Sequence, residues 1–168
     1  MTATGSSALL LAAFNTAATV DAERDAARCC ASRPFAAAIA AGRPYADLDA
    51  LDAAIDAEFG RLGWPEIAGA VADHPRIGGP TAAGWSRAEQ AGAAAAAQDV
   101  AAGLADGNQA YQEKFGHVFL VCASGLTAGQ MLDQLRARLG NDPATERQVA
   151  ADELRKITRL RMRKLLGG

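Results

Sequence analysis

The stretch Asp47-Leu-Asp-Ala-Leu-Asp-Ala-Ala-Ile-Asp-Ala-Glu-Phe59 decides the structural class of this chain. Asp47 is a favourable N-cap residue, because its carboxylate can accept a hydrogen bond from the first helical turn. Large apolar side chains follow at helical spacing, at Leu48, Leu51, Ile55 and Phe59. The positions between them are Ala, Asp and Glu, so one face is apolar and the opposite face is polar. The pattern predicts an amphipathic helix whose apolar stripe lies in a core.

The composition of the whole chain agrees with this segment. Among 168 residues there are 42 alanines, and the 16 leucines outnumber the 11 Val and Ile residues together. Ala and Leu are strong helix formers, whereas β-branched residues favour strands. No internal repeat or linker divides the chain. We therefore expect an all-α fold, a single compact multi-helix domain over residues 1–168.

Helix boundaries follow from prolines, glycines and the 3.6-residue periodicity. They predict further helices over residues 8–14, 21–30, 35–41, 66–72, 86–104, 107–115, 127–139 and 144–166. Residues 73–84 contain two prolines and three glycines and are expected to form a loop. The apolar run 118–122 is expected to be extended or to start a helical turn, because a single strand would have no partner.

Charge and composition disfavour several functions. The 17 Lys and Arg residues are balanced by 19 Asp and Glu residues, so a basic nucleic-acid-binding surface is not expected. No apolar run reaches the ~20 residues of a membrane span, and the N-terminal residues lack the basic start of a signal peptide. We therefore expect a cytoplasmic protein that binds neither nucleic acid nor membrane.

The cysteines and histidines do not have the spacing of a metal site. Cys29 and Cys30 are adjacent, Cys122 is isolated, and the two histidines, His74 and His117, lie in different contexts. Zinc sites usually need clustered Cys and His ligands, and disulfide frameworks usually have an even number of cysteines. We therefore expect no zinc site and a reducing compartment.

His74 is the first candidate for chemistry. It precedes Pro75, and a residue before proline is pushed out of the helical region into an extended conformation. The imidazole is therefore held away from the preceding helix, as suits a side chain that faces a ligand. The alternative is a histidine at a helix end that interacts with the last carbonyls. His117 is flanked by apolar residues and is expected on the surface or in a satisfied pocket.

Ser86-Arg-Ala-Glu89 matches a capping box, in which the Ser and Glu side chains bond to each other's backbone N–H groups. This structural role is the simpler interpretation. The same geometry places Ser86, Glu89 and Gln90 at a helix N-terminus, where polar ligands bind readily.

Arg161 stands out on the terminal helix. With Ile157 as origin and about 100° per residue, Arg161 lies at about +40°, between Leu154 and Leu160 on the apolar face. Three other arginines, Arg155, Arg159 and Arg163, fall on the opposite face, as expected for solvated side chains. An inward arginine needs a partner or a polar cavity, because an uncompensated buried guanidinium is costly. A side chain that reaches solvent, or an ion pair, is the alternative.

Several segments in order resemble the 2-oxo-4-hydroxy-4-carboxy-5-ureidoimidazoline (OHCU) decarboxylase family of urate degradation, from about Phe14 to Leu166. They are Cys29-Cys-Ala-Ser-Arg33 with Ala41-Gly-Arg-Pro-Tyr-Ala-Asp47, His74-Pro-Arg-Ile-Gly78, Trp85-Ser-Arg-Ala-Glu-Gln90, Tyr111-Gln-Glu-Lys-Phe-Gly116, Val118-Phe-Leu-Val-Cys-Ala-Ser-Gly125 and Lys156-Ile-Thr-Arg-Leu-Arg161. Two features depart from the family, a short 78–85 loop and the residue at position 117.

The resemblance implies an all-helical homodimer without metal or organic cofactor. It also implies loss of CO₂ from OHCU to give (S)-allantoin. Matched by position, the catalytic residues are His74, Glu89 and Arg161. The substrate contacts implied in the same way are Pro75, Ser86, Gln90, Val121, Cys122, Ala123 and Gly125. We expect these residues to converge on one cavity lined by residues 118–125.

Two other functions are compatible with the residues. One is a non-catalytic helical interaction module, in which His74 and Glu89 only cap helices. The other is a different cofactor-free lyase or hydrolase that acts on a ureide. The first predicts no polar pocket that joins the three catalytic candidates, and substrate profiling separates the second.

Overall fold

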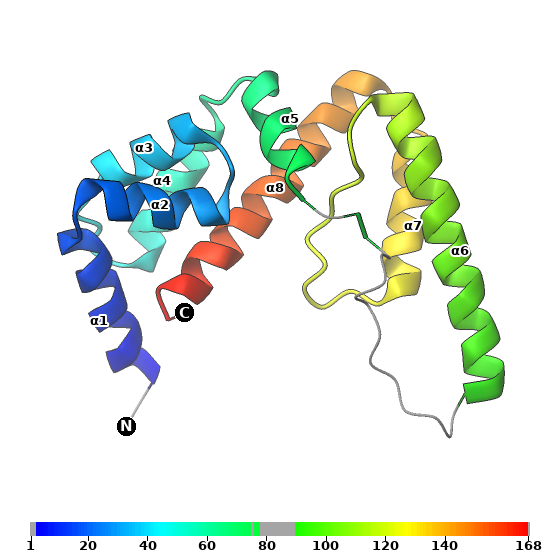
Figure 1. The fold of residues 1–168 in the computed structure, drawn as a ribbon, viewed down its shortest axis with the longest axis horizontal. Helices are drawn as coiled ribbons and strands as arrows, with labels where there is room; N and C mark the ends of the chain where they lie inside the picture. Colours follow the sequence, from blue (N-terminus) through cyan, green and yellow to red (C-terminus); the bar gives the residue numbers. More distant parts are fainter. Residues whose placement is uncertain (1–2, 75, 78–89, 168) are drawn as a thin grey trace. The chain divides into compact units, whose positions relative to one another are not determined.

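The computed structural model describes residues 3–74, 76–77 and 90–167, and the side chains of residues 8–74, 76–77 and 97–167. These residues form eight helices and no strand, so the predicted all-α class is confirmed for the part described (Figure 1). In chain order the helices are α1 (Ala3–Thr16), α2 (Thr19–Cys29), α3 (Arg33–Ala41), α4 (Leu48–Phe59), α5 (Trp64–Ala72), α6 (Gln90–Phe115), α7 (Ala128–Arg138) and α8 (Pro143–Leu165).

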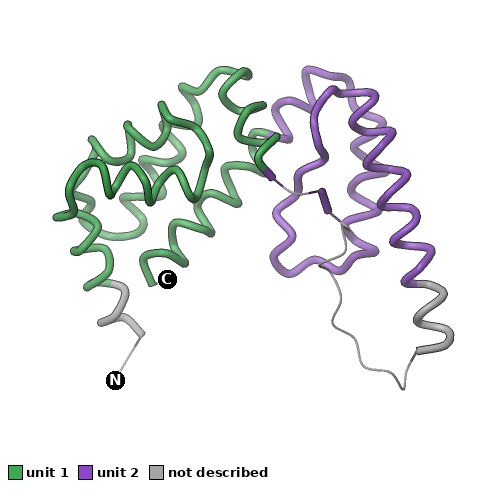
Figure 2. The backbone as a smooth tube through the Cα atoms, viewed as in Figure 1, with its two compact units in different colours: residues 1–73, 151–168 green, residues 74–150 purple. Residues whose placement is uncertain are grey.

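The chain folds into two compact units (Figure 2). Unit 1 comprises residues 1–73 and 151–168, and unit 2 comprises residues 74–150. Helix α8 begins in unit 2 and ends in unit 1. His74 is therefore the first residue of unit 2, whereas Arg161 belongs to unit 1.

The core of unit 1 is built by α2, α3 and α4 together with the end of α8. Phe35, Ile39, Leu51 and Ile55 are fully buried in it. Asp47 caps α4 as predicted, because its Oδ1 accepts a 2.7 Å hydrogen bond from the Ala50 N–H. The apolar stripe predicted for this helix is confirmed by the burial of Leu51, Ile55 and Phe59, although Leu48 is only half-buried.

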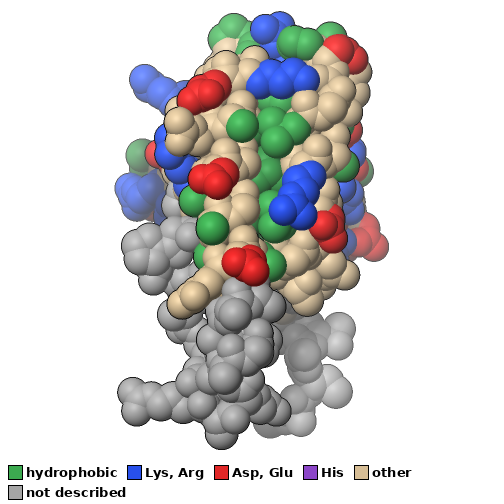
Figure 3. Space-filling view, turned by 90° about the vertical axis from the view of Figure 1, so that its right-hand side faces the viewer, with side chains coloured by type: hydrophobic (Ala, Val, Ile, Leu, Met, Phe, Trp, Pro, Cys, Tyr) green, Lys and Arg blue, Asp and Glu red, His purple; other side chains and the backbone are tan. Residues whose placement is uncertain are grey.

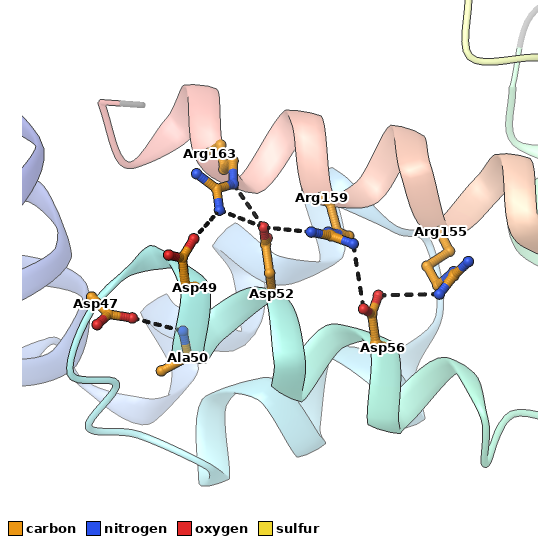
Figure 4. Close-up of polar contacts among 8 residues, drawn as sticks. All are labelled: Asp47, Asp49, Ala50, Asp52, Asp56, Arg155, Arg159 and Arg163. Carbon is orange, nitrogen blue, oxygen red and sulfur yellow. Dashed lines mark hydrogen bonds and ion pairs between the residues drawn. The ribbon is translucent and has the colours of Figure 1, made fainter.

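Helices α4 and α8 are also joined by ion pairs on their polar sides (Figure 4). The aspartates are Asp49, Asp52 and Asp56, and the arginines are Arg155, Arg159 and Arg163. Asp52 is central: its side chain is 4% exposed, and its Oδ2 lies 2.9 Å from Arg159 and 2.7 Å from Arg163. The prediction that these arginines form a purely solvated face is therefore wrong, because α4 supplies their counter-charges.

Unit 2 is organised around the packing of α6 against α7. The predicted break between helices 86–104 and 107–115 is absent, and α6 continues through Gly103 and Gly107. A Cβ at Gly107 would lie 2.6 Å from the Leu135 Cδ2, and one at Gly103 would lie 2.9 Å from the Leu132 Cδ2. These glycines allow close approach of the helices rather than ending one of them. On the face of unit 2 where α6 lies, charged side chains flank a stripe of hydrophobic ones (Figure 3).

Candidate functional site

His74 lies directly after α5, one residue beyond its C-cap Asp73, and is half-buried. The chain that follows is attached to α6. The Arg76 guanidinium donates to the Gln112 Oε1, and the Asn108 Nδ2 donates to the Ile77 carbonyl at 3.0 Å. Two α6 side chains thus hold the Ile77 carbonyl and the Arg76 side chain. Such anchoring limits the positions that the imidazole can adopt.

The segment from Val118 to Gly125 connects α6 and α7 without regular secondary structure. Residues 118–122 are not helical, which agrees with one of the two alternatives expected for them, an extended run. Phe119, Leu120 and Val121 are buried, whereas Ala123 is exposed and Cys122 is partly exposed. Gly125 has a φ of +79°, in the region that only glycine enters without strain. The Leu126 N–H closes this turn by donating to the Ala123 carbonyl at 3.0 Å.

One apolar cluster of unit 2 joins the two segments. Phe119 and Val121 lie in its centre with Tyr111 of α6, and Ile77 packs against it. Ile77, three residues after His74, and the 118–125 segment therefore share a core within unit 2.

A buried polar cluster that the sequence analysis missed holds the 118–125 segment. Arg138 of α7 donates from Nη1 to the Leu120 carbonyl at 2.7 Å and from Nε to the Glu146 Oε1 at 2.7 Å. Tyr111 donates to the same Glu146 oxygen, and Asn141 donates to the other one at 2.8 Å. Arg138 also lies 4.6 Å from the Phe119 ring centroid. The 118–125 segment is therefore held by the buried Arg138 guanidinium, which is itself paired with the Glu146 carboxylate.

No pattern in the sequence indicated this cluster, because its members come from different helices. Tyr111 of α6 is 27 residues from Arg138 of α7 and 35 residues from Glu146 of α8. The nearest signal was the turn Gly140-Asn-Asp-Pro143, which brings the start of α8 back to the end of α7. Burial raises the pKa of Tyr111, and its hydrogen bond to Glu146 acts in the same direction. The Tyr111 hydroxyl therefore stays protonated at neutral pH and donates its hydrogen bond to Glu146.

His117 lies in an aromatic pocket, as one of the two alternatives predicted. It is 8% exposed, its ring meets that of Tyr111 edge to face at 5.3 Å, and its Nδ1 lies 3.1 Å from the Val118 carbonyl. Burial lowers its pKa, because the charged imidazolium is disfavoured there. His117 is thus a neutral packing residue beside the 118–125 segment.

Arg161 differs from its prediction. It is exposed, and its Nη1 donates to the Cys29 carbonyl at 3.4 Å. The expectation that it lies inside the buried stripe is wrong, because that stripe advances in steps of four residues, through Ala150, Leu154, Thr158 and Met162. Ile157, taken as the centre, is only half-buried. Arg161 instead lines a surface cavity of about 300 Å³ in unit 1, with Arg28, Cys29, Lys164 and Leu165.

Four other candidate site residues lie wholly or partly outside the described part of the chain. Pro75, Ser86 and Glu89 are outside the described residues, and so is the side chain of Gln90. Because His74 and Arg161 belong to different units, their convergence on one cavity stays a prediction.

Within the described residues, no group of three or more His, Cys, Asp or Glu side chains is placed to hold a metal ion. In the same part of the chain, no helix has the length and apolar character needed to cross a membrane. Among the residues that the structure describes, Cys29, Cys30 and Cys122 form no disulfide.

The fold and these sites define an all-helical protein in which an irregular backbone segment and Ile77, shortly after a half-buried histidine, pack on one helical core. The sequence model of the OHCU decarboxylase family matches residues 15–163. The chain belongs to this family. The matched range includes His74, Glu89 and Arg161, together with residues of both units.

Two relatives and two structures show how far the similarity extends. The chain is 36% identical over 145 residues to the uric acid degradation bifunctional protein TTL of Arabidopsis thaliana, covering 82% of this chain and 45% of that protein. It is 36% identical over 138 residues to the 2-oxo-4-hydroxy-4-carboxy-5-ureidoimidazoline decarboxylase of Amia calva, covering 78% and 79%. This chain therefore spans less than half of the plant protein's length but most of the fish protein's.

A crystal structure of an OHCU decarboxylase in the presence of (S)-allantoin is similar with a TM-score of 0.69 and 35% identity, over 84% of this chain and 96% of that one. A crystal structure of an (S)-allantoin synthase matches with a TM-score of 0.70 and 16% identity, over 92% and 53%. The second likeness concerns the fold alone.

Proposed function

We propose that this chain is a carboxy-lyase that converts OHCU to (S)-allantoin in urate degradation. The observation that carries the proposal is the family match over residues 15–163, which includes all three catalytic candidates. The 36% identity to the Amia calva decarboxylase supports it.

The reaction is within reach of side chains alone. Decarboxylation leaves an electron pair on the carbon that carried the carboxylate, and the adjacent carbonyl and imidazoline system can delocalise it. The protein must orient the departing carboxylate and deliver a proton to one face of that carbon. We therefore propose a reaction without metal or organic cofactor.

His74 is proposed as the general acid or base. An unperturbed imidazole has a pKa near 6.5, which suits proton exchange at neutral pH. Its fixed place after α5, with Arg76 and Ile77 bonded to α6, supports this role. Glu89 is proposed to orient His74 or the substrate hydroxyl group.

Substrate binding is proposed for three side chains and two backbone regions. Arg161, Ser86 and Gln90 would bind the ureido and ring oxygens of OHCU. The backbone around Pro75 and from Val121 through Cys122, Ala123 and Gly125 would complete the pocket. The anchoring of Leu120 by Arg138 supports a backbone that stays in place when substrate binds.

A homodimer in the cytoplasm is the proposed form of the protein, with a small molecule as its partner and neither nucleic acid nor membrane. The dimer rests on family resemblance alone. Light scattering checks it directly, and a monomer would remove the claim without affecting the proposed reaction.

The decisive experiment follows the product's handedness. OHCU made in solution from urate by uricase and hydroxyisourate hydrolase decays spontaneously to racemic allantoin. With this protein present, circular dichroism should show faster loss of OHCU and an optically active product. If rate and racemic outcome are unchanged, the decarboxylase proposal fails and the interaction module becomes the better explanation.

Three substitutions test the proposed roles in the same assay. His74→Ala should lower kcat by about 10²–10⁴-fold, the usual contribution of general acid–base catalysis.

Glu89→Gln keeps most capping hydrogen bonds but removes the charge, so an unchanged rate in a folded variant would assign Glu89 to capping. Arg161→Lys keeps the charge but loses the planar fork, and should chiefly raise KM.

A further inference from the structure

The cations of α8 in unit 1 divide into two groups. Between residues 155 and 164 there are six, namely Arg155, Lys156, Arg159, Arg161, Arg163 and Lys164. Four of them pair with Asp or Glu side chains at 2.6 to 3.5 Å. Arg161 and Lys164 form no such pair with any side chain that the structure describes. Most cations in this part of α8 are therefore paired with acidic side chains, and Arg161 and Lys164 remain as neighbouring positive charges on its surface.

Both of these cations line one cavity. This open surface cavity of about 300 Å³ is lined by Arg161, Lys164 and Leu165 of α8 and by Arg28 and Cys29 of α2. Its lining therefore has three positive side chains and no acidic one. A volume of this size accommodates a small organic anion.

The neighbouring groups do not cancel this charge. Burial raises the pKa of Cys29 to about 11, so its thiol is uncharged at neutral pH. Asp25 lies 3.7 Å from Arg28, outside the cavity lining, and offsets part of the charge of that exposed side chain. The C-terminal ends of α2 and α8 carry about half a negative charge each, which offsets about one of the three positive charges. The cavity keeps a net positive potential.

We propose that Arg28 and Lys164 form an anion-attracting rim that steers the carboxylate-bearing substrate to Arg161. This inference rests on the proposed function and deepens it. Arg161 is the residue that contacts the substrate, whereas Arg28 and Lys164 act at longer range by raising the local concentration of the anion. Such steering increases the rate of capture and leaves the chemical step unchanged.

The kinetic test uses neutral substitutions and one matched control. Lys164→Gln and Arg28→Gln each remove one positive charge from the rim. Lys156→Gln removes the same charge from the same helix, at a side chain that pairs with Glu153 and does not line the cavity. At low ionic strength each rim variant should lower kcat/KM by about threefold and the double variant by about tenfold. The difference should vanish near 1 M salt, where the Debye length is about 3 Å.

Equal kcat/KM in the rim variants and Lys156→Gln at low salt would overturn the proposal while leaving the decarboxylase assignment intact. So would a fall in kcat of the same size as the fall in kcat/KM, because steering acts before the chemical step.

A binding experiment needs no turnover and separates this proposal from the proposed function. Inorganic phosphate is titrated into protein with ¹⁵N-labelled arginine, and the Nε–H signals of Arg28 and Arg161 are followed by NMR. Saturable shifts that weaken in Lys164→Gln but not in Lys156→Gln are expected. If the wild type does not act on OHCU, the substrate assignment falls and this titration decides whether the cavity binds anions. Absence of shifts would show that it does not.

Discussion

At the residue scale, Glu146 shows how the core of unit 2 tolerates a charge. It is fully buried, and Tyr111, Arg138 and Asn141 all donate hydrogen bonds to its carboxylate. A buried carboxylate is tolerated only when its partners replace the lost hydration. Arg138, one of these partners, also donates to the Leu120 carbonyl, so the Arg138–Glu146 pair helps to hold the backbone of the candidate site.

Replacing Glu146 with Gln should be far more costly than replacing Tyr111 with Phe. The first change leaves the buried Arg138 guanidinium without its counter-charge, which typically costs about 3–5 kcal/mol. The second removes one hydroxyl group while keeping the ring, and should cost about 1–3 kcal/mol. Urea denaturation measures both values. Similar losses of stability in the two variants would contradict a dominant role for the Arg138–Glu146 pair.

The cysteines differ in reactivity for a residue-scale reason. Burial raises the pKa values of Cys29 and Cys30 to about 11 from the ordinary 9.0. At pH 8 their thiolate fraction is then about a hundredfold smaller, because each pKa unit is a factor of about ten. Iodoacetamide at this pH should modify the partly exposed Cys122 first, as detected by mass spectrometry. The labelling of the other two should rise as the pH approaches 11.

The same experiment in guanidinium chloride provides the control, since all three cysteines should then be modified. Rapid labelling of Cys29 or Cys30 in the native protein at pH 8 would contradict the burial of their thiols.

At the element scale, α6 and α7 pack closely because α6 has glycines where α7 has leucines. Gly107 lies against Leu135, which is fully buried and cannot move away easily. Isolated glycines inside a helix usually lower its stability. In α6 this cost is offset by the packing of the leucine side chains on the helix backbone.

Gly107→Ala should therefore destabilise the protein although alanine is the better helix former. A Cβ at 2.6 Å from the Leu135 Cδ2 forces repacking, which typically costs about 1–3 kcal/mol. Gly69→Ala in α5 is the matched control, because no atom lies within 4 Å of a Cβ there. That variant should gain up to about 1 kcal/mol. Thermal unfolding compares the two, and a stabilised Gly107→Ala variant would show that the α6–α7 contact can relax.

At the scale of the whole molecule, the family match spans both compact units. The proposed reaction draws His74 from unit 2 and Arg161 from unit 1. We therefore propose that the two units act as one catalytic domain over residues 1–168. A structure with (S)-allantoin bound should show both residues on the ligand, and a ligand that contacts neither would refute the site assignment.

The purified protein should be active without added metal and insensitive to EDTA. The proposed chemistry needs only a proton donor and fixed polar groups, because the substrate itself delocalises the electron pair. Activity is measured before and after chelation in the optical assay. Loss of activity in EDTA that a divalent ion restores would overturn the cofactor-free mechanism.

The sequence by itself determined the helical class, most helix boundaries and the candidate residues. Asp47 at the start of α4 and proline at the start of α3 act on their own backbone, so their effect is visible without knowing the fold. The motif around His74 is also local, because Pro75 restricts the residue that precedes it.

Tertiary structure alone decided features that depend on distant partners. Gly107 looks like a helix break until Leu135 is placed against it, and Arg159 looks solvated until α4 brings Asp52 to 2.9 Å. Arg161 was expected on the buried face because Ile157 was taken as the centre of the apolar stripe. The buried residues of α8 instead follow each other in steps of four, through Leu154, Thr158 and Met162. Glu146 gave no signal, since its partners come from other helices. Local conformation is set within a few residues, whereas burial and pairing are set by segments that meet only after folding.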